Sequence, residues 1–264
     1  METIQEPIRD KMERRSQTFL YDGSFNGFLT AVYIAFKHKL VHADIQPTGS
    51  IQKGLFTETE TIFTNIDKAK RVWNGIRNRN NTAIKNIYFA FLSEERGIEP
   101  LLYTYVRKVM NYSENSTEGF SSDCILRINQ LAHKVQREKI RMESKLDFQR
   151  TGDAVYYAQI TPDFDILPLL SKHFRSRYAD KPWIIYDTKR NYGLYCDLSG
   201  VELIGLDLTD SQMKELNLNS SLSKVDMGSS YVDNLNIKAY ISVKLHDSYG
   251  ATQKINYTSE QKVG

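Results

Sequence analysis

Four ionisable residues are of the types that acid–base or metal chemistry uses. Asp163 and Asp165 lie two positions apart in Pro162-Asp163-Phe164-Asp165, His173 follows them, and Asp22 lies in an Asp-Gly turn near the N-terminus. If these four side chains converged in one cleft, they could transfer protons in a reaction. The alternative is structural, because Asp163 and Asp165 would also suit the capped start of a helix. Residues two apart on a helix do not share a face, which weakens the hypothesis of a shared metal.

A second set of residues is of the types that contact nucleic acid. The chain has six positive residues and no negative one from Lys68 to Lys85, and residues 127–145 are also rich in Lys and Arg. Such side chains neutralise phosphates without choosing a sequence, although a solvated helix face is the alternative interpretation. The candidate phosphate contacts are Lys68, Lys70, Arg71, Arg77, Arg79, Arg137, Arg141, Arg177 and Arg190. The candidate rings for stacking on a base are Tyr21, Trp183 and Tyr192.

Several motifs are absent from the sequence, and their absence argues against whole classes of protein. The sequence contains no GxxxxGK[ST], no strand-linked GxGxxG, no GxSxG and no paired-cysteine deaminase pattern. Its two cysteines, Cys124 and Cys196, are too few for a disulfide framework and indicate a reducing compartment. We therefore expect no cofactor and no metal.

Hydrophobic periodicity predicts the elements that position these residues in the N-terminal half. Thr18–Tyr21 is typical of a short strand, Asp22-Gly23 of a turn, and Ser24 of the cap of a following helix. Residues 41–64 are aperiodic and predict an ordered loop. Helices are expected from Asn65, over residues 84–92 and 101–109, and from Ser122 or Asp123 to about residue 145.

The pattern changes after residue 146 to one that predicts a small sheet. Residues 146–150 and 154–160 indicate a hairpin, residues 161–174 a helix that opens at Thr161-Pro162-Asp163, and residues 183–186 and 192–197 two further strands. The expected class is α+β, with a helical N-terminal part packed on an antiparallel ββαββ unit. The expected divisions are a polar extension (1–17), a mainly helical part (18–145), the ββαββ part (146–208) and a divergent polar tail (209–264).

Charge and hydropathy bound the partners and the location of the protein. The formal net charge of the 264 residues is only +3, yet residues 1–150 carry 23 Lys and Arg against 18 Asp and Glu. The modest total therefore does not exclude a nucleic-acid partner. The most apolar run, residues 27–36, is about half as long as a membrane span. We expect a cytoplasmic protein with no membrane contact.

Two long segments resemble a known bacterial family of DNA metabolism or DNA repair proteins, whose C-terminal half is a domain of unknown function. The segments are Tyr21–Val32 and Tyr156–Leu170, and Asn65–Arg77, Ala90–Val106 and positions from His173 to Gly193 agree as well. The resemblance covers roughly residues 18–208. Two departures are Ile140-Arg141-Met142, where the family is expected to have His-Arg-Met, and a tail that lacks the family's basic, aromatic character.

The resemblance implies a process rather than a reaction. Members of the family are typically encoded beside a radical-SAM protein, and the domain is elsewhere fused to a uracil-DNA-glycosylase-like domain. The first hypothesis is therefore a DNA-binding accessory factor that works with a radical-SAM partner. The alternatives are an enzyme acting on damaged or modified nucleotides through an Asp/His cleft, and an adaptor that binds only protein.

Overall fold

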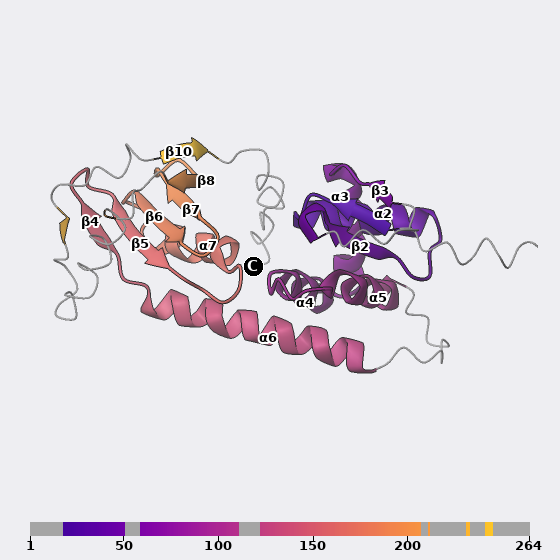
Figure 1. Ribbon diagram of the computed structural model, residues 1–264. Helices are drawn as coiled ribbons and strands as arrows, with labels where there is room; N and C mark the ends of the chain where they lie inside the picture. Colours follow the sequence, from indigo (N-terminus) through magenta and orange to yellow (C-terminus); the bar gives the residue numbers. More distant parts are fainter. Residues whose placement is uncertain are drawn as a thin grey trace, which may run out of the picture. The chain divides into compact units, whose positions relative to one another are not determined.

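The computed structural model describes residues 18–50, 59–110, 122–206, 211, 231–232 and 241–244. The chain divides into two compact units (Figure 1). Unit 1 comprises Met1–Phe91 and Glu95–Gln130, and unit 2 comprises Leu92–Glu94 and Leu131–Gly264. The predicted α+β class is confirmed, with helices in the N-terminal half and a sheet after them. The predicted extension over residues 1–17 lies outside the described residues, as does most of the predicted tail.

Unit 1 contains a small parallel sheet that the sequence pattern did not predict in full. The predicted strand β1 (Thr18–Tyr21) lies between β2 (Asp44–Pro47) and β3 (Thr59–Thr61), and both neighbours pair with it in parallel. These two edge strands fall inside the predicted loop over residues 41–64. They have four and three residues with mostly polar side chains, so they lack the alternation that indicates a strand.

The helices of unit 1 follow the predicted periodicity. They are α2 (Phe25–Lys37), α3 (Ile66–Arg79), α4 (Asn81–Phe91), α5 (Ile98–Met110) and the start of α6 (Ser122–Lys145), with the short 3-10 helix η1 (Thr48–Ser50) after β2. Ser24 caps α2 as predicted, because its hydroxyl accepts a hydrogen bond from the Gly27 N–H. Phe25 is the centre of the aromatic core, with ring centroids at 4.9 Å from Tyr88, 5.1 Å from Phe91 and 6.0 Å from Trp73.

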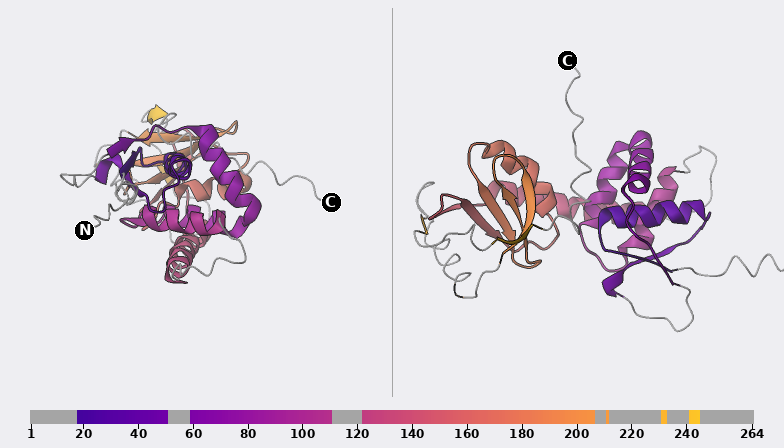
Figure 2. Two further views of the ribbon diagram at one scale, coloured as in Figure 1. Left: turned by 90° about the vertical axis from the view of Figure 1, so that its right-hand side faces the viewer. Right: turned by 90° about the horizontal axis from the view of Figure 1, so that it is seen from above.

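Unit 2 is built on a mixed sheet, which corrects the prediction of an antiparallel one. The strands are β4 (Gln149–Thr151), β5 (Tyr156–Ile160), β6 (Trp183–Asp187), β7 (Tyr192–Cys196), β8 (Val201–Leu206), β9 (Tyr231–Val232) and β10 (Ile241–Lys244), in the order β10-β8-β7-β6-β5-β4-β9. Strands β5 and β6 are parallel neighbours. Helix α7 (Leu167–Arg177) joins them across one face of the sheet (Figures 1 and 2). A helical crossover returns the chain to the edge where it started, so the two strands it joins run in parallel.

Helix α7 begins later than predicted. Its N-cap is Ile166, which makes no side-chain cap, and the first helical residues include Pro168. Residues 161–166 form a loop whose backbone donors find other partners. The Asp163 and Phe164 N–H groups donate to Glu138, and the Asp165 N–H donates to the Leu92 carbonyl. The interpretation of Asp163 and Asp165 as helix caps is therefore wrong.

Among the described residues, no helix combines the length and the apolar character that crossing a membrane requires.

Candidate functional site

The exposed side of α3 carries a row of cationic and amide side chains. Lys70, Arg71, Asn74, Arg77 and Asn78 recur at i, i+1, i+4, i+7 and i+8, a spacing that places them on one side of a helix. All five are exposed. We call them the α3 cationic face. Its positive side chains form no ion pair with any described residue.

Packing on the opposite side fixes the orientation of this face. Ala69, Val72, Trp73 and Ile76 of α3 are buried in the core of unit 1. The Asn65 side chain caps the helix by accepting from the Lys68 N–H at 3.0 Å. Because the apolar side of α3 is buried and Asn65 caps its N-terminus, the cationic face is directed to solvent.

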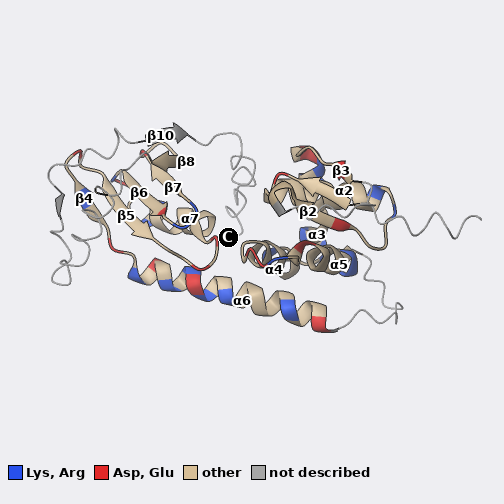
Figure 3. Ribbon diagram, viewed as in Figure 1, with Lys and Arg blue, Asp and Glu red and all other residues tan. Residues whose placement is uncertain are grey.

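The other predicted phosphate contacts on α3 and α6 differ in whether another side chain occupies their charged group. Arg79 is exposed and donates to the Met110 sulfur, while the Lys68 ammonium lies 5.9 Å from the centroid of the Tyr33 ring. On α6, Lys and Arg recur along the helix (Figure 3). Arg141 pairs with Glu138 at 2.8 Å, whereas Arg137 is exposed and has no ion pair among the described residues. Part of the charge of α6 is thus neutralised by its own carboxylates.

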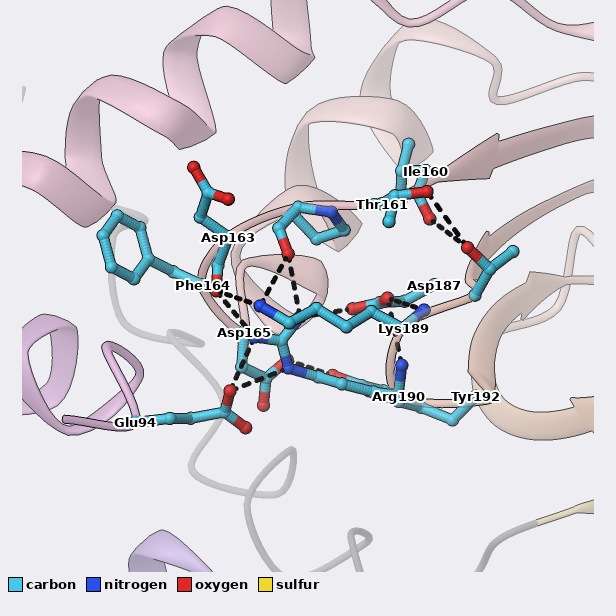
Figure 4. A network of polar contacts seen from close by, with 12 residues as sticks. Glu94, Ile160, Thr161, Asp163, Phe164, Asp165, Asp187, Lys189, Arg190 and Tyr192 are labelled. Carbon is cyan, nitrogen blue, oxygen red and sulfur yellow. Dashed lines mark hydrogen bonds and ion pairs between the residues drawn. The ribbon is translucent and has the colours of Figure 1, made fainter. Parts of the chain in front are cut away.

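A partly buried polar network lies where β5 and β6 end in unit 2, and Arg190 is its centre (Figure 4). The Arg190 side chain is only 10% exposed. Its Nη1 donates to Asp187 Oδ2 at 2.8 Å, and its Nη2 donates to Glu94 Oε2 at 2.6 Å. Its Nε also donates to Glu94, and the carbonyls of Pro162 and Asp163 accept from Nη1 and Nη2.

These five hydrogen bonds use every donor that a guanidinium has. Arg190 therefore has none left for a phosphate, and its prediction as a phosphate contact is wrong. Burial by itself would lower the pKa of the guanidinium, but hydrogen bonds to Glu94 and Asp187 outweigh this and raise it. The arginine is a permanent positive charge that holds two loops and the segment 92–94 together.

Asp165 is a carboxyl with a changed proton affinity inside this network. Burial raises its pKa to about 6, although the hydrogen bond from the Tyr192 hydroxyl and the charge of Arg190 act in the opposite direction. Strongly perturbed carboxyls are common at functional sites, but structural networks also produce them. Here the described contacts of Asp165 are structural, because its carboxylate accepts from Tyr192 and its N–H donates to the Leu92 carbonyl, and both hold the loop in place.

Two further charged residues hold the same loop. Lys189 Nζ donates to the Asp163 carbonyl at 2.8 Å, and both oxygens of the buried Glu138 accept from backbone N–H groups of the loop. The Asp163 carboxylate itself is exposed and points away from Lys189 and Arg190 (Figure 4). Glu94, Glu138, Asp187 and Lys189 were missing from the sequence prediction. Glu94 has its partner 96 positions away, and Glu138 and Lys189 bond backbone groups of the loop. Asp187 pairs with Arg190 only three positions later, so this short spacing was a signal in the sequence.

Asp22 occupies a separate environment in unit 1. Its Oδ1 accepts from the backbone N–H and the hydroxyl of Ser24, and its Oδ2 accepts from Thr64 Oγ1 at 2.7 Å. The carboxylate thus joins the end of β1 to the loop after β3. Both oxygens are used in this structural role.

His173 lies beside α6 rather than in the network. Its Nδ1 is 3.8 Å from Glu143 Oε1, and Glu143 also pairs with Lys139 at 2.6 Å. The described contacts therefore bring none of the four predicted acid–base residues, Asp22, Asp163, Asp165 and His173, together. Within the described ranges, no cluster of three or more His, Cys, Asp or Glu has the arrangement of a metal site.

The three predicted stacking rings are all core residues. Tyr21 and Tyr192 are buried and donate hydrogen bonds to Glu99 and Asp165, and Trp183 is buried against Phe174. Their faces cannot receive a base, so the stacking prediction for these rings is wrong. Arg177, by contrast, is exposed at the end of α7, with its guanidinium 5.9 Å from the centroid of the Tyr178 ring.

The fold and these sites define an α+β protein with a basic helix face in unit 1 and a charge-paired loop network in unit 2. The model of the family described as a domain of unknown function, DUF4130, matches residues 96–254. Because this match covers more than half of the chain, the chain belongs to that family. No curated protein matches the chain. Residues 18–95, which include α3, lie outside the family match.

Proposed function

We propose that this protein binds nucleic acid through the α3 cationic face and acts as a DNA-binding accessory factor in DNA repair or DNA metabolism. The observation that carries the proposal is the exposure of Lys70, Arg71 and Arg77 with no ion pair to a described residue. Free cations on a rigid helix can exchange their counterions for phosphates, which is the main source of sequence-independent affinity.

Residue types on the face support a phosphate backbone as the ligand. Arg offers bidentate hydrogen bonds to phosphate, and the amides of Asn74 and Asn78 add neutral donors between the charges. Asp67, in the first turn of α3, is the exposed acidic residue at this end of the helix. It suits the positive end of the helix dipole and leaves the following turns cationic.

Of the two alternative functions, the Asp/His cleft has less support in the described contacts. An Asp/His cleft requires its side chains to converge. Instead, Asp22 bonds Thr64, Asp165 bonds Tyr192, and His173 lies beside Glu143. A protein-only adaptor would use the same cationic face for an acidic partner, and co-purification at high salt without DNA would identify it. The resemblance adds a radical-SAM protein as a partner, and that association stays a prediction.

Charge reversal on α3 tests the proposal. Arg71→Glu/Arg77→Glu is expected to weaken binding to a labelled DNA duplex at least tenfold at low ionic strength. The dependence of log K on log salt concentration should also become shallower by about 2, since two phosphate contacts are lost. Fluorescence anisotropy titrations at several salt concentrations measure both quantities.

The matched control is Lys172→Glu/Arg175→Glu on α7 in unit 2, which changes the net charge by the same amount at two exposed positions. This control should bind the duplex with an affinity close to that of the unmodified protein. Equal losses in the two variants would show a general charge effect and contradict a binding site on α3.

A further inference from the structure

A large aromatic side chain is exposed just before the start of α3, the helix that bears the α3 cationic face. Phe63 is 85% exposed, while the preceding residue, Ile62, is buried. Phe63 contributes almost nothing to the core, and it lies two residues before Asn65, the N-cap of α3.

The backbone on both sides of Phe63 is held firmly. The Ile62 N–H donates to the Leu20 carbonyl at 2.7 Å, which continues the pairing of β3 with β1. Thr64 Oγ1 donates to Asp22 at 2.7 Å, and the Asn65 N–H donates to Thr30 Oγ1 at 3.2 Å. The ring is therefore presented to solvent from a fixed position and not from a loose loop.

An exposed apolar side chain by itself needs no explanation. The position of Phe63 adds the second observation, because the helix that starts just after it bears the free cations. With a rise of about 1.5 Å per residue, Arg71 lies roughly 9 Å and Arg77 roughly 18 Å along the axis from Asn65. A nucleic-acid strand whose phosphates follow α3 to its N-terminal end would reach the part of the chain that carries Phe63.

We infer that Phe63 stacks on an unpaired base of a single-stranded or locally opened nucleic acid whose backbone lies along the α3 cationic face. Sites for single strands combine a cationic track with aromatic rings, because every base has a π-face and the phosphates supply the charge. The inference rests on the proposed function and names its substrate class. A base paired inside a duplex does not offer its face, so the contribution of Phe63 is specific to unpaired bases.

The closing experiment compares two nucleic acids and three variants. The probes are a labelled oligothymidylate single strand and a labelled duplex, and the variants are Phe63→Ala, Phe63→Trp and the control Val41→Ala, which is also exposed in unit 1. Phe63→Ala should weaken single-strand binding about tenfold and leave duplex binding unchanged. Phe63→Trp, which keeps an aromatic ring, should bind the single strand as tightly as the unmodified protein does. Val41→Ala should have no effect on the binding of either probe.

Three further readouts separate stacking from other roles. The salt dependence of single-strand binding should be the same in Phe63→Ala and in the unmodified protein, because no phosphate contact is removed. Thermal unfolding should also be unchanged, since the ring is not part of the core. Sedimentation velocity tests the competing occupant, a second copy of the chain.

The outcomes distinguish this inference from the function on which it rests. If the unmodified protein binds neither probe, the proposed function fails and the inference fails with it. If it binds and Phe63→Ala binds the single strand equally well, only the inference is overturned. A dimer that Phe63→Ala converts to a monomer would assign the ring to self-association and overturn the inference as well.

Discussion

At the scale of single residues, Asp165 shows how the fold changes a common side chain. Its carboxyl is ordinary in sequence, with a typical pKa of 3.8, and burial in the loop at the end of β5 raises this value to about 6. Tyr192 and Arg190 favour the charged form but do not outweigh the loss of solvent. The residue therefore binds a proton more tightly in the folded than in the unfolded chain.

This difference predicts a pH dependence of stability. Between about pH 4 and pH 6 the folded state holds the proton and the unfolded state does not, so stability from this group falls as pH rises through that window. Asp165→Asn cannot titrate. Its free energy of unfolding, relative to that of the unmodified protein, should therefore increase from pH 4 to pH 7, by at most about 3 kcal/mol. Urea unfolding at the two pH values measures the change.

The exposed Asp163→Asn is the matched control, because its carboxylate takes no part in the network (Figure 4). Its difference from the unmodified protein should stay nearly constant over the same range. A difference for Asp165→Asn that stays constant, or that decreases with pH, would contradict a raised pKa.

At the scale of elements, the joint between β1 and α2 depends on a close approach that a glycine permits. A Cβ at Gly27 would collide with Asp22 Oδ1 and lie 2.9 Å from Thr64 Oγ1. Asp22 in turn holds Ser24, the cap of α2, and Thr64, in the loop after β3. The absence of a side chain at Gly27 therefore allows the start of α2, the end of β1 and the loop after β3 to meet at Asp22.

Gly27→Ala should destabilise the protein by about 1–3 kcal/mol, because the methyl group must displace the Asp22 carboxylate. This result would run against helix propensity, which favours Ala over Gly by about 1 kcal/mol. Gly75→Ala in α3 is the comparison, since its Cβ would meet only the flexible end of Met110, at 3.2 Å. Urea unfolding checks both variants, and a larger loss at position 75 than at position 27 would contradict the explanation.

Element boundaries show where sequence patterns are informative. The amphipathic helices α3 to α6 are visible in the sequence because each buries one face, and periodicity records that face. The start of α7 is not visible, because Glu138 and Leu92 compete with helix hydrogen bonds for the N–H groups of residues 163–165. A pattern of apolar residues contains no information about such distant acceptors.

At the scale of the whole molecule, each compact unit contains one tryptophan, Trp73 in unit 1 and Trp183 in unit 2. Within unit 2, Arg190 ties the segment 92–94 to the loops of the sheet through Glu94, which is 96 positions away in sequence. The buried Asp187 is the other carboxylate that this arginine neutralises. The long-range contact is thus expected to support unit 2 as a whole.

Arg190→Met should lower the free energy of unfolding of unit 2 by about 3–5 kcal/mol, because it leaves the Asp187 charge buried and without the guanidinium. Fluorescence of Trp183 in a Trp73→Phe background reports unit 2, and fluorescence of Trp73 in a Trp183→Phe background reports unit 1. The urea midpoint reported by Trp183 should fall more than that reported by Trp73.

The exposed Arg175→Met provides the control and should change stability by no more than about 0.5 kcal/mol. Arg190→Lys keeps the charge but cannot make five hydrogen bonds, so its loss should be intermediate. Equal shifts of both tryptophan midpoints would contradict a role confined to unit 2.

The sequence by itself determined the α+β class, the main helices, strand β1, the four strands β4 to β7 and the basic character of α3. These features are local, since hydrophobic periodicity and runs of charge are properties of neighbouring residues. Only the tertiary structure decided that Tyr21, Trp183 and Tyr192 are core residues and that Phe63 is exposed. It also decided that Arg190 forms its ion pairs with Glu94 and Asp187. The physical reason is that burial and charge pairing depend on groups far apart along the chain, which no local pattern specifies.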